Sequence, residues 1–181
     1  TGSMCGPSRA GFITGRFQSS FGYYRNASHP LDPKQGLPAG TTTVAAYLQD
    51  QGYVTGGVGK WHMGDIPESW AMNQGFDYAQ HAIHQQGQLT IYNDDAIREQ
   101  VSVGIADFDE AYTVDDWFRP DASAMATVIE GTAGGPIREI RMEAGERWNA
   151  EKYDEMTRAF QDKTVDDLER LAGGDEPFFL Q

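Results

Sequence analysis

Residues 5–16, with the sequence Cys-Gly-Pro-Ser-Arg-Ala-Gly-Phe-Ile-Thr-Gly-Arg, decide how the first part of the chain folds. A proline early in this segment and a glycine near its end predict a short helix over residues 7–14, with Gly15 as its C-terminal cap. Cys5 stands just ahead of this helix, where unpaired N–H groups and the positive end of the helix dipole favour an anionic group. Arg9 lies one helical turn further on, so its guanidinium can reach back toward residue 5 and hold an oxyanion.

A second readable unit follows after a proline-rich loop. Residues 41–51 predict a helix capped by three threonines, and residues 53–58 predict a strand. The strand enters the glycine-rich loop 59–64, which holds Lys60 and His62. In open α/β sheets ligands bind at the carboxyl ends of the strands. A surface lysine is usually solvated and a lone histidine is usually structural, but together, beside an anion-binding helix, they indicate a functional site.

The last part of the chain predicts another helix and strand. Residues 151–172 carry apolar side chains at helical spacing and are followed by two glycines, and residues 177–180 then begin a buried strand. Residues 81–150 contain acidic clusters and turn signals but predict no regular element. His81 and His84 are interpreted as loop residues that could border a substrate pocket.

Composition and charge limit the kinds of binding partner that the chain can have. The chain has 181 residues, 39% of them hydrophobic, which fits one globular α/β core or a part of a larger one. The net charge of -13 argues against nucleic acid and against an anionic membrane surface as partners. A local cluster of basic side chains can still attract an anionic substrate. Because the chain has a single cysteine, it cannot form an internal disulfide. It has no run of about 18 apolar residues, so the sequence predicts no membrane span.

The first segment resembles the signature of the type I, formylglycine-dependent sulfatases, C-x-P-S-R followed by T-G-R. Seven positions match, namely Cys5, Pro7, Ser8, Arg9, Thr14, Gly15 and Arg16. At roughly 5% per residue type, a chance match is on the order of one in a billion per start point. The loop 59–64 resembles the G-K-W-H segment of arylsulfatase-like family members, and residues 52–53 and 75–77 are also similar to the family.

This resemblance implies an α/β fold of the alkaline-phosphatase-like kind, with a mainly parallel sheet flanked by helices and only partly present in this chain. Residues 1–80 would carry the catalytic loop and the sulfate-binding segment, 81–150 an insertion or loops, and 151–181 a helix and a strand. The sequence begins at Thr1 without an initiator methionine and ends inside an apolar run. We therefore expect a fragment of a sulfatase catalytic domain with two cut ends.

The resemblance also implies a reaction. A maturation enzyme oxidises Cys5 to formylglycine, whose hydrated aldehyde attacks sulfur with one hydroxyl and expels sulfate with the other. Arg9 supports the formylglycine, Lys60 holds the sulfate, and His62 orients or deprotonates the diol. A bound Ca²⁺, with the formylglycine of Cys5 as one ligand, neutralises sulfate charge. The implied substrate is a sulfated small molecule or carbohydrate, and the implied compartment is periplasmic or extracellular.

The other metal ligands of the family are expected outside this chain: an Asp pair upstream of the cysteine loop, and an Asp with an Asn or Gln far downstream. The adjacent Asp pairs at 94–95, 115–116 and 166–167 could stand in for them. Adjacent Asp residues more often cap helices or lie at a solvated surface, so this reading is disfavoured. Because most metal ligands are missing, we expect the 181-residue chain to be inactive alone.

Two alternative functions fit the same residues. Phosphonate or phosphate ester hydrolases of the same superfamily also use formylglycine, and the cysteine motif does not separate the two ester classes. Ser8 and the Gly59-Lys60-Trp61-His62 segment favour a sulfatase. The second alternative is an inactive truncated chain that folds in part and binds nothing.

Overall fold

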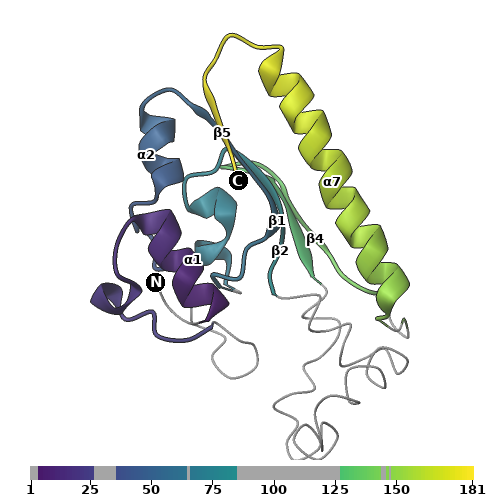
Figure 1. Cartoon of the computed structure of the whole chain (residues 1–181), viewed down its shortest axis with the longest axis horizontal. Coiled ribbons are helices and arrows are strands. Elements are labelled where there is room, and N and C mark those ends of the chain that lie inside the picture. The colour runs from purple at the N-terminus through teal and green to yellow at the C-terminus, as the bar shows by residue number, and fades with distance from the viewer. Residues whose placement is uncertain (1–3, 27–35, 65, 85–126, 144–145, 147) are drawn as a thin grey trace, which may run out of the picture.

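The computed structural model describes residues 4–26, 36–64, 66–84, 127–143, 146 and 148–181. Its centre is a five-stranded sheet in the order β4-β3-β2-β1-β5 (Figure 1). The strands are β1 (Val54–Lys60), β2 (Tyr78–Ala82), β3 (Val128–Thr132), β4 (Ile137–Ile140) and β5 (Phe178–Leu180). β1 pairs in parallel with β2 and β5, whereas β3 is antiparallel to both β2 and β4. The α/β class is confirmed, and the sheet is mixed, with its parallel part around β1.

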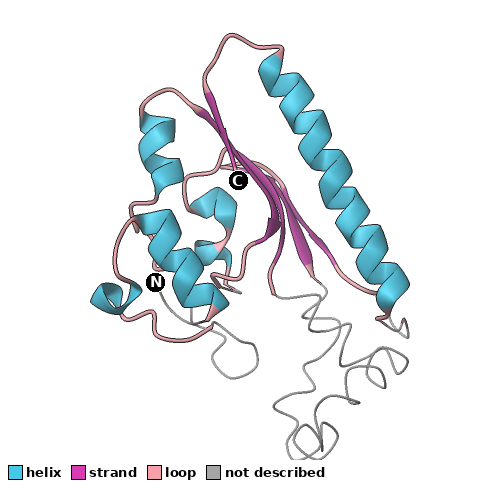
Figure 2. Ribbon diagram, viewed as in Figure 1, coloured by secondary structure: helices cyan, strands magenta, loops and turns pink. Residues whose placement is uncertain are grey.

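Helices cover both faces of this sheet (Figures 1 and 2). α7 (Ala150–Ala172) lies on one side, and the other elements on the opposite side: α1 (Cys5–Thr14), α2 (Val44–Asp50) and the 3₁₀ helices η1 (Gln18–Phe21), η2 (Pro67–Ser69) and η3 (Ala71–Asn73). The buried core lies on the α1 and α2 side. There Trp61 packs edge-on against Phe76, with ring centroids 5.7 Å apart.

Local sequence explains where these helices begin and end. α1 ends at Gly15, whose φ of 62° is a left-handed conformation that glycine adopts readily. The Thr43 hydroxyl accepts the Ala46 N–H at 3.0 Å and caps α2, and the Asn149 carboxamide accepts the Lys152 N–H at 3.0 Å and caps α7. The predicted helices at 7–14, 41–51 and 151–172 and the predicted strands at 53–58 and 177–180 are confirmed within about one helical turn.

A buried acidic residue anchors α7 to the sheet. Asp167 is 2% exposed and accepts hydrogen bonds from Lys163 at 2.5 Å and from Arg170 at 3.3 Å. Both cations also lie 4.9 Å from the centre of the Tyr78 ring in β2. The expectation of a cap or a solvated position is therefore wrong for Asp167, because its place in the helical repeat turns it toward the sheet. Its partners are cations, so it forms ion pairs rather than a metal site.

Three strands, β2, β3 and β4, were not predicted from the sequence. β3 and β4 form a hairpin whose turn contains Gly134 at a φ of 67°. β4 is exposed along its whole length, so the apolar run that marks a buried strand is missing. His81 was expected in a loop, but it lies in β2 and is fully buried. The loop interpretation of His81 is therefore wrong, because β2 is too short and polar to be recognised by periodicity.

We expect His81 to make the folded chain less stable in acid. Burial lowers the pKa of His81 from 6.5 to about 3, and its Nε2 accepts the Ala71 N–H at 3.4 Å. Between these pH values the unfolded chain binds a proton that the folded chain excludes. The stabilisation is complete above the unfolded pKa and is lost as the pH falls toward the folded one, by about 1.4 kcal/mol per pH unit. Between about pH 7 and pH 4.5, the free energy of unfolding measured with urea should fall less for His81→Gln than for wild type. An equal fall in the two proteins would contradict a buried, neutral His81.

Candidate active site

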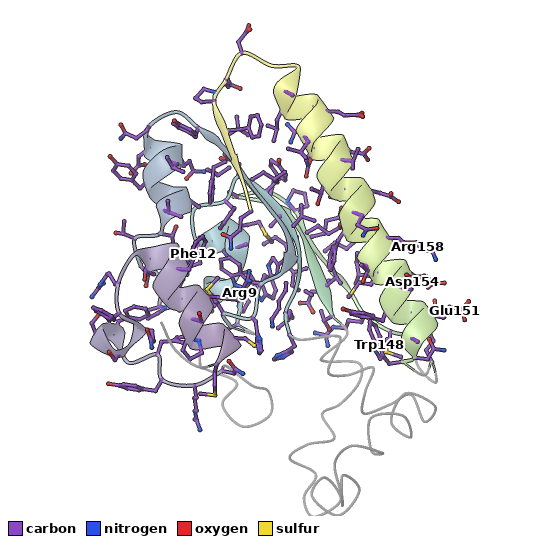
Figure 3. The ribbon with its side chains drawn as sticks, in the orientation of Figure 1. Arg9, Phe12, Trp148, Glu151, Asp154 and Arg158 are labelled. Carbon is purple, nitrogen blue, oxygen red and sulfur yellow. The ribbon has the colours of Figure 1, made fainter. Side chains whose placement is uncertain are left out.

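Arg9 joins the first helix to the end of the central strand. Its Nε donates to the Trp61 carbonyl at 2.7 Å, and its Nη2 donates to the Lys60 carbonyl at 2.5 Å. Because Lys60 is the last residue of β1, these bonds dock α1 on the carboxyl end of that strand. Arg9 lies on the side of α1 that faces the sheet (Figure 3). The segments 5–16 and 59–64, which the sequence marked separately, therefore meet at one site.

Cys5 is the first residue of α1 and is exposed. Burial lowers the pKa of the Arg9 guanidinium, and the charge of a Cys5 thiolate raises it, so the two groups lie within electrostatic reach of each other. The Nε and Nη2 bonds of Arg9 go to backbone carbonyls rather than to residue 5. In this arrangement Arg9 holds the 60–61 backbone and adds positive charge beside Cys5.

Most backbone N–H groups of the first helical turn already donate hydrogen bonds within the protein. Gly6 N–H donates to Asn26 Oδ1 at 2.7 Å, Ser8 N–H donates to the Met4 carbonyl at 3.0 Å, and Pro7 has no N–H. The expectation of an open row of N–H donors at this helix end is therefore wrong for residues 6–8. An anion beside Cys5 must rely mainly on side chains.

His62 is held in an unusual backbone conformation. Its φ of 57° is left-handed, which is rare for a residue other than glycine and costs on the order of 1–3 kcal/mol. Its N–H donates to the Ile83 carbonyl at 3.0 Å, and Trp61 N–H donates to the Ala82 carbonyl at 2.9 Å. These bonds continue the β1–β2 pairing past the end of β1 and fix the strained residue. Such strain concentrates at functional sites.

The His62 imidazole is buried among positive charges. Its residue is 6% exposed, and its Nδ1 has no hydrogen-bond partner among the described residues. Burial is the main cause that lowers the pKa of His62 to about 3, and the charges of Lys60, His84 and Arg9 lower it further. The ring is therefore neutral at neutral pH. The cationic groups around it favour an anionic ligand, whose charge would restore some of the basicity of His62.

His84 lies in a loop, as predicted, but its contact with His62 was not predicted from the sequence. It is 3% exposed, and its ring meets the His62 ring edge to face, with centroids 5.8 Å apart. It follows the carboxyl end of β2, the parallel neighbour of β1. Because β2 was not recognised as a strand, the sequence did not show that His84 follows the carboxyl end of the strand next to β1, close to Lys60.

The described residues do not make a calcium site. Within the described ranges there is no group of three or more His, Cys, Asp or Glu side chains that could hold a metal ion. Lys60, His62 and His84 suit an anion, whereas Ca²⁺ needs several oxygen ligands. The Asp pairs at 94–95 and 115–116 fall outside the described residues.

A separate cleft of about 290 Å³ lies on the other side of the sheet. It is lined mainly by apolar side chains, among them Val128 of β3, Met156 and Phe160 of α7, and Trp148, which precedes α7. Figure 3 shows Trp148 at the foot of α7, away from Arg9. None of its described lining residues comes from α1 or from the 60–64 segment, so this cleft is not part of the Cys5 site.

A family model described as Sulfatase matches residues 1–181. The chain therefore belongs to the sulfatase family. It is 45% identical to Homo sapiens Arylsulfatase G over 76 residues, which cover 42% of this chain and 14% of that protein. It is also 38% identical over 80 residues to Homo sapiens N-acetylgalactosamine-6-sulfatase, covering 41% and 15%.

The fold is similar to that of a solved structure, the PsFucS1 sulfatase from Pseudoalteromonas sp., with a TM-score of 0.68 and 22% identity. That likeness covers 99% of this chain and 33% of the solved one. The chain thus spans about a third of the solved sulfatase that it matches. In the part of the chain that the structure describes, no helix has the length and apolar character of a membrane span.

Arg9→Lys should impair an active enzyme carrying this sequence nearly as much as Arg9→Ala. Lysine keeps the charge but loses the planar fork that bonds two carbonyls, so we expect kcat to fall roughly tenfold to a hundredfold. The matched control is Arg158→Lys, because Arg158 pairs with Asp154 on the exposed side of α7 (Figure 3). Steady-state hydrolysis of an aryl sulfate measures both. Full activity of Arg9→Lys would show that only charge matters at position 9.

Proposed function

We propose that this sequence provides the nucleophile and part of the anion-binding site of a sulfuric ester hydrolase. The observation that carries the proposal is the contact between two signature segments: Arg9 donates to the carbonyls of Lys60 and Trp61 and thereby docks the helix that begins at Cys5 on the segment that holds Lys60 and His62. Membership of the sulfatase family supports the same reaction class.

Cys5 is suited to become formylglycine. It is exposed at the start of α1, so a modified side chain can meet a substrate, and the charge of Arg9 lies within reach. A hydrated formylglycine would supply two hydroxyls on one carbon, one to attack sulfur and one to expel the sulfate afterwards.

The residues around Cys5 would bind the sulfate, accept the proton of the nucleophile and position the backbone. Lys60 would bind the sulfate as a point charge, because it ends β1 at the edge where the anion would lie. His62 would orient the nucleophile and accept its proton, because its Nδ1 is buried and has no partner among the described residues. Arg9 would keep the 60–61 backbone in place beside residue 5.

A divalent metal is part of the proposal only at the level of the family. The described residues do not fit a calcium site, so no step of the reaction is assigned to the ion. We keep the prediction that Ca²⁺ binds with the modified Cys5 as one ligand and with carboxylates from other parts of the enzyme. A maturation enzyme that oxidises Cys5, and a periplasmic or extracellular location, likewise remain predictions.

A sulfated carbohydrate is the substrate class that we propose. The name of N-acetylgalactosamine-6-sulfatase, which is 38% identical over 80 residues, supports this class. The cluster of Lys60, His62 and Arg9 recognises the ester group rather than the alcohol, so the alcohol is not specified further.

The reaction class is tested by the relative turnover of an aryl sulfate and an aryl phosphonate by the complete enzyme that carries this sequence. A sulfatase should prefer the aryl sulfate by kcat/KM. A preference for the phosphonate would support the phosphonate hydrolase alternative instead. Turnover of neither ester, with residue 5 fully converted, would leave only the inactive alternative.

A further inference from the structure

The first turn of α1 is capped by a residue from another segment. The residue that precedes the helix, Met4, makes no side-chain hydrogen bond to the helix end. Helix ends leave N–H groups without intrahelical partners, and a side-chain oxygen usually satisfies one of them. Here Asn26, twenty residues further along the chain, accepts the Gly6 N–H through its Oδ1 at 2.7 Å, in a partly buried bond.

Three segments meet at Gly6. A Cβ placed on Gly6 would lie 3.0 Å from Asn26 Oδ1 and 3.0 Å from the carbonyl oxygen of His62. A side chain at this position would make both contacts tight, so the Asn26 carboxamide or the His62 backbone would have to move by a few tenths of an ångström. The backbone next to Cys5 is therefore packed closely against both the Asn26 carboxamide and the backbone of a proposed catalytic residue, His62.

We propose that Asn26 is a positioning residue, whose carboxamide oxygen holds the backbone of residues 5–6 so that the side chain at position 5 faces the Lys60 and His62 edge of the site. The inference rests on the proposed function. Arg9 fixes the 60–61 side of the site through Nε and Nη2, and Asn26 fixes the Cys5 side through Gly6. Together, these hydrogen bonds fix the position of the nucleophile relative to the anion-binding loop.

The neutral carboxamide also suits an anion site. An Asp at position 26 would accept the same N–H bond but would add a negative charge beside an anionic ester. Asn26→Asp therefore keeps the positioning bond and changes the charge, whereas Asn26→Leu removes the acceptor at similar size. The two variants separate the hydrogen bond from the electrostatics.

In the complete enzyme, normalised to its formylglycine content, Asn26→Leu should lower kcat for an aryl sulfate by roughly tenfold to a hundredfold, since small displacements of reacting groups have effects of this size. Asn26→Asp should keep most of kcat and mainly raise KM. The matched control is Asn149→Ala, which removes the same kind of cap from α7, on the far side of the sheet. It should lower the melting temperature and leave kcat unchanged.

Amide hydrogen exchange at Gly6 provides a readout that does not need activity. Asn26→Leu should speed exchange of the Gly6 N–H, and Asn26→Asp should retain its protection. Equal kcat values for wild type and Asn26→Leu, equal losses in the Leu and Asp variants, or unchanged Gly6 exchange in Asn26→Leu would each overturn the inference. A wild type that hydrolyses no sulfate ester overturns the proposed function instead, and Gly6 exchange still decides whether Asn26 holds residue 6.

Discussion

Cys5→Ser should abolish multiple turnover of an aryl sulfate while the fold stays intact. Serine has one hydroxyl, so it can attack sulfur once but has no second hydroxyl on the same carbon to release the product. We expect kcat to fall at least about a thousandfold, as for other essential nucleophiles. Intact-mass measurement after incubation with substrate should show one sulfate group added to the serine variant.

The matched variant for this experiment is Cys5→Ala, which should show neither turnover nor added sulfate. Both substitutions are small changes at an exposed position, so the melting temperatures should stay close to that of wild type. Near wild-type turnover by Cys5→Ala would remove residue 5 from the reaction.

The second large effect is expected at the end of β1. Lys60→Ala and His62→Asn should each lower kcat by about 10²–10³, because each removes a preorganised charge or donor from the site. Asparagine is preferable to alanine at position 62, since the φ of 57° there is better tolerated by asparagine. The substitution thus removes the imidazole with little change in backbone strain, and steady-state kinetics with an aryl sulfate measures the loss.

Lys152→Ala is the control for Lys60→Ala. Lys152 forms an ion pair with Glu146 at 2.6 Å near the start of α7 and belongs to no part of the proposed site. It should change kcat little. A fall in kcat of less than about threefold for Lys60→Ala or His62→Asn would show that the substituted residue is not a preorganised part of the site.

Much of this site could be predicted from the sequence because its chemistry lies in two short, contiguous segments. The proline and glycine positions of 5–16 located α1, and the glycine-rich loop after a predicted strand located Lys60 and His62. The roles of these residues stay predictions. What the sequence could not show was the contact itself, since the bonds from Arg9 to the 60–61 backbone join residues about fifty positions apart.

The missed features have physical causes. β4 is exposed and β2 is short, so neither has the apolar pattern that marks a strand, and His81 was therefore misplaced in a loop. The capping role of Asn26 depends on a tertiary contact with Gly6 that local spacing cannot reveal. Asp167 is buried, and its charge is balanced by ion pairs with Lys163 and Arg170 of its own helix. An aspartate in a helix is usually exposed, so its residue type did not predict this burial.

The most direct test of the central claim is peptide mass spectrometry of residue 5 after coexpression with a formylglycine-generating maturation enzyme. Cys5 is the only cysteine of the chain, so the peptide that contains it is unambiguous. We predict that this peptide carries an aldehyde at position 5 in place of the thiol. A fully unmodified thiol at Cys5 under these conditions would contradict it.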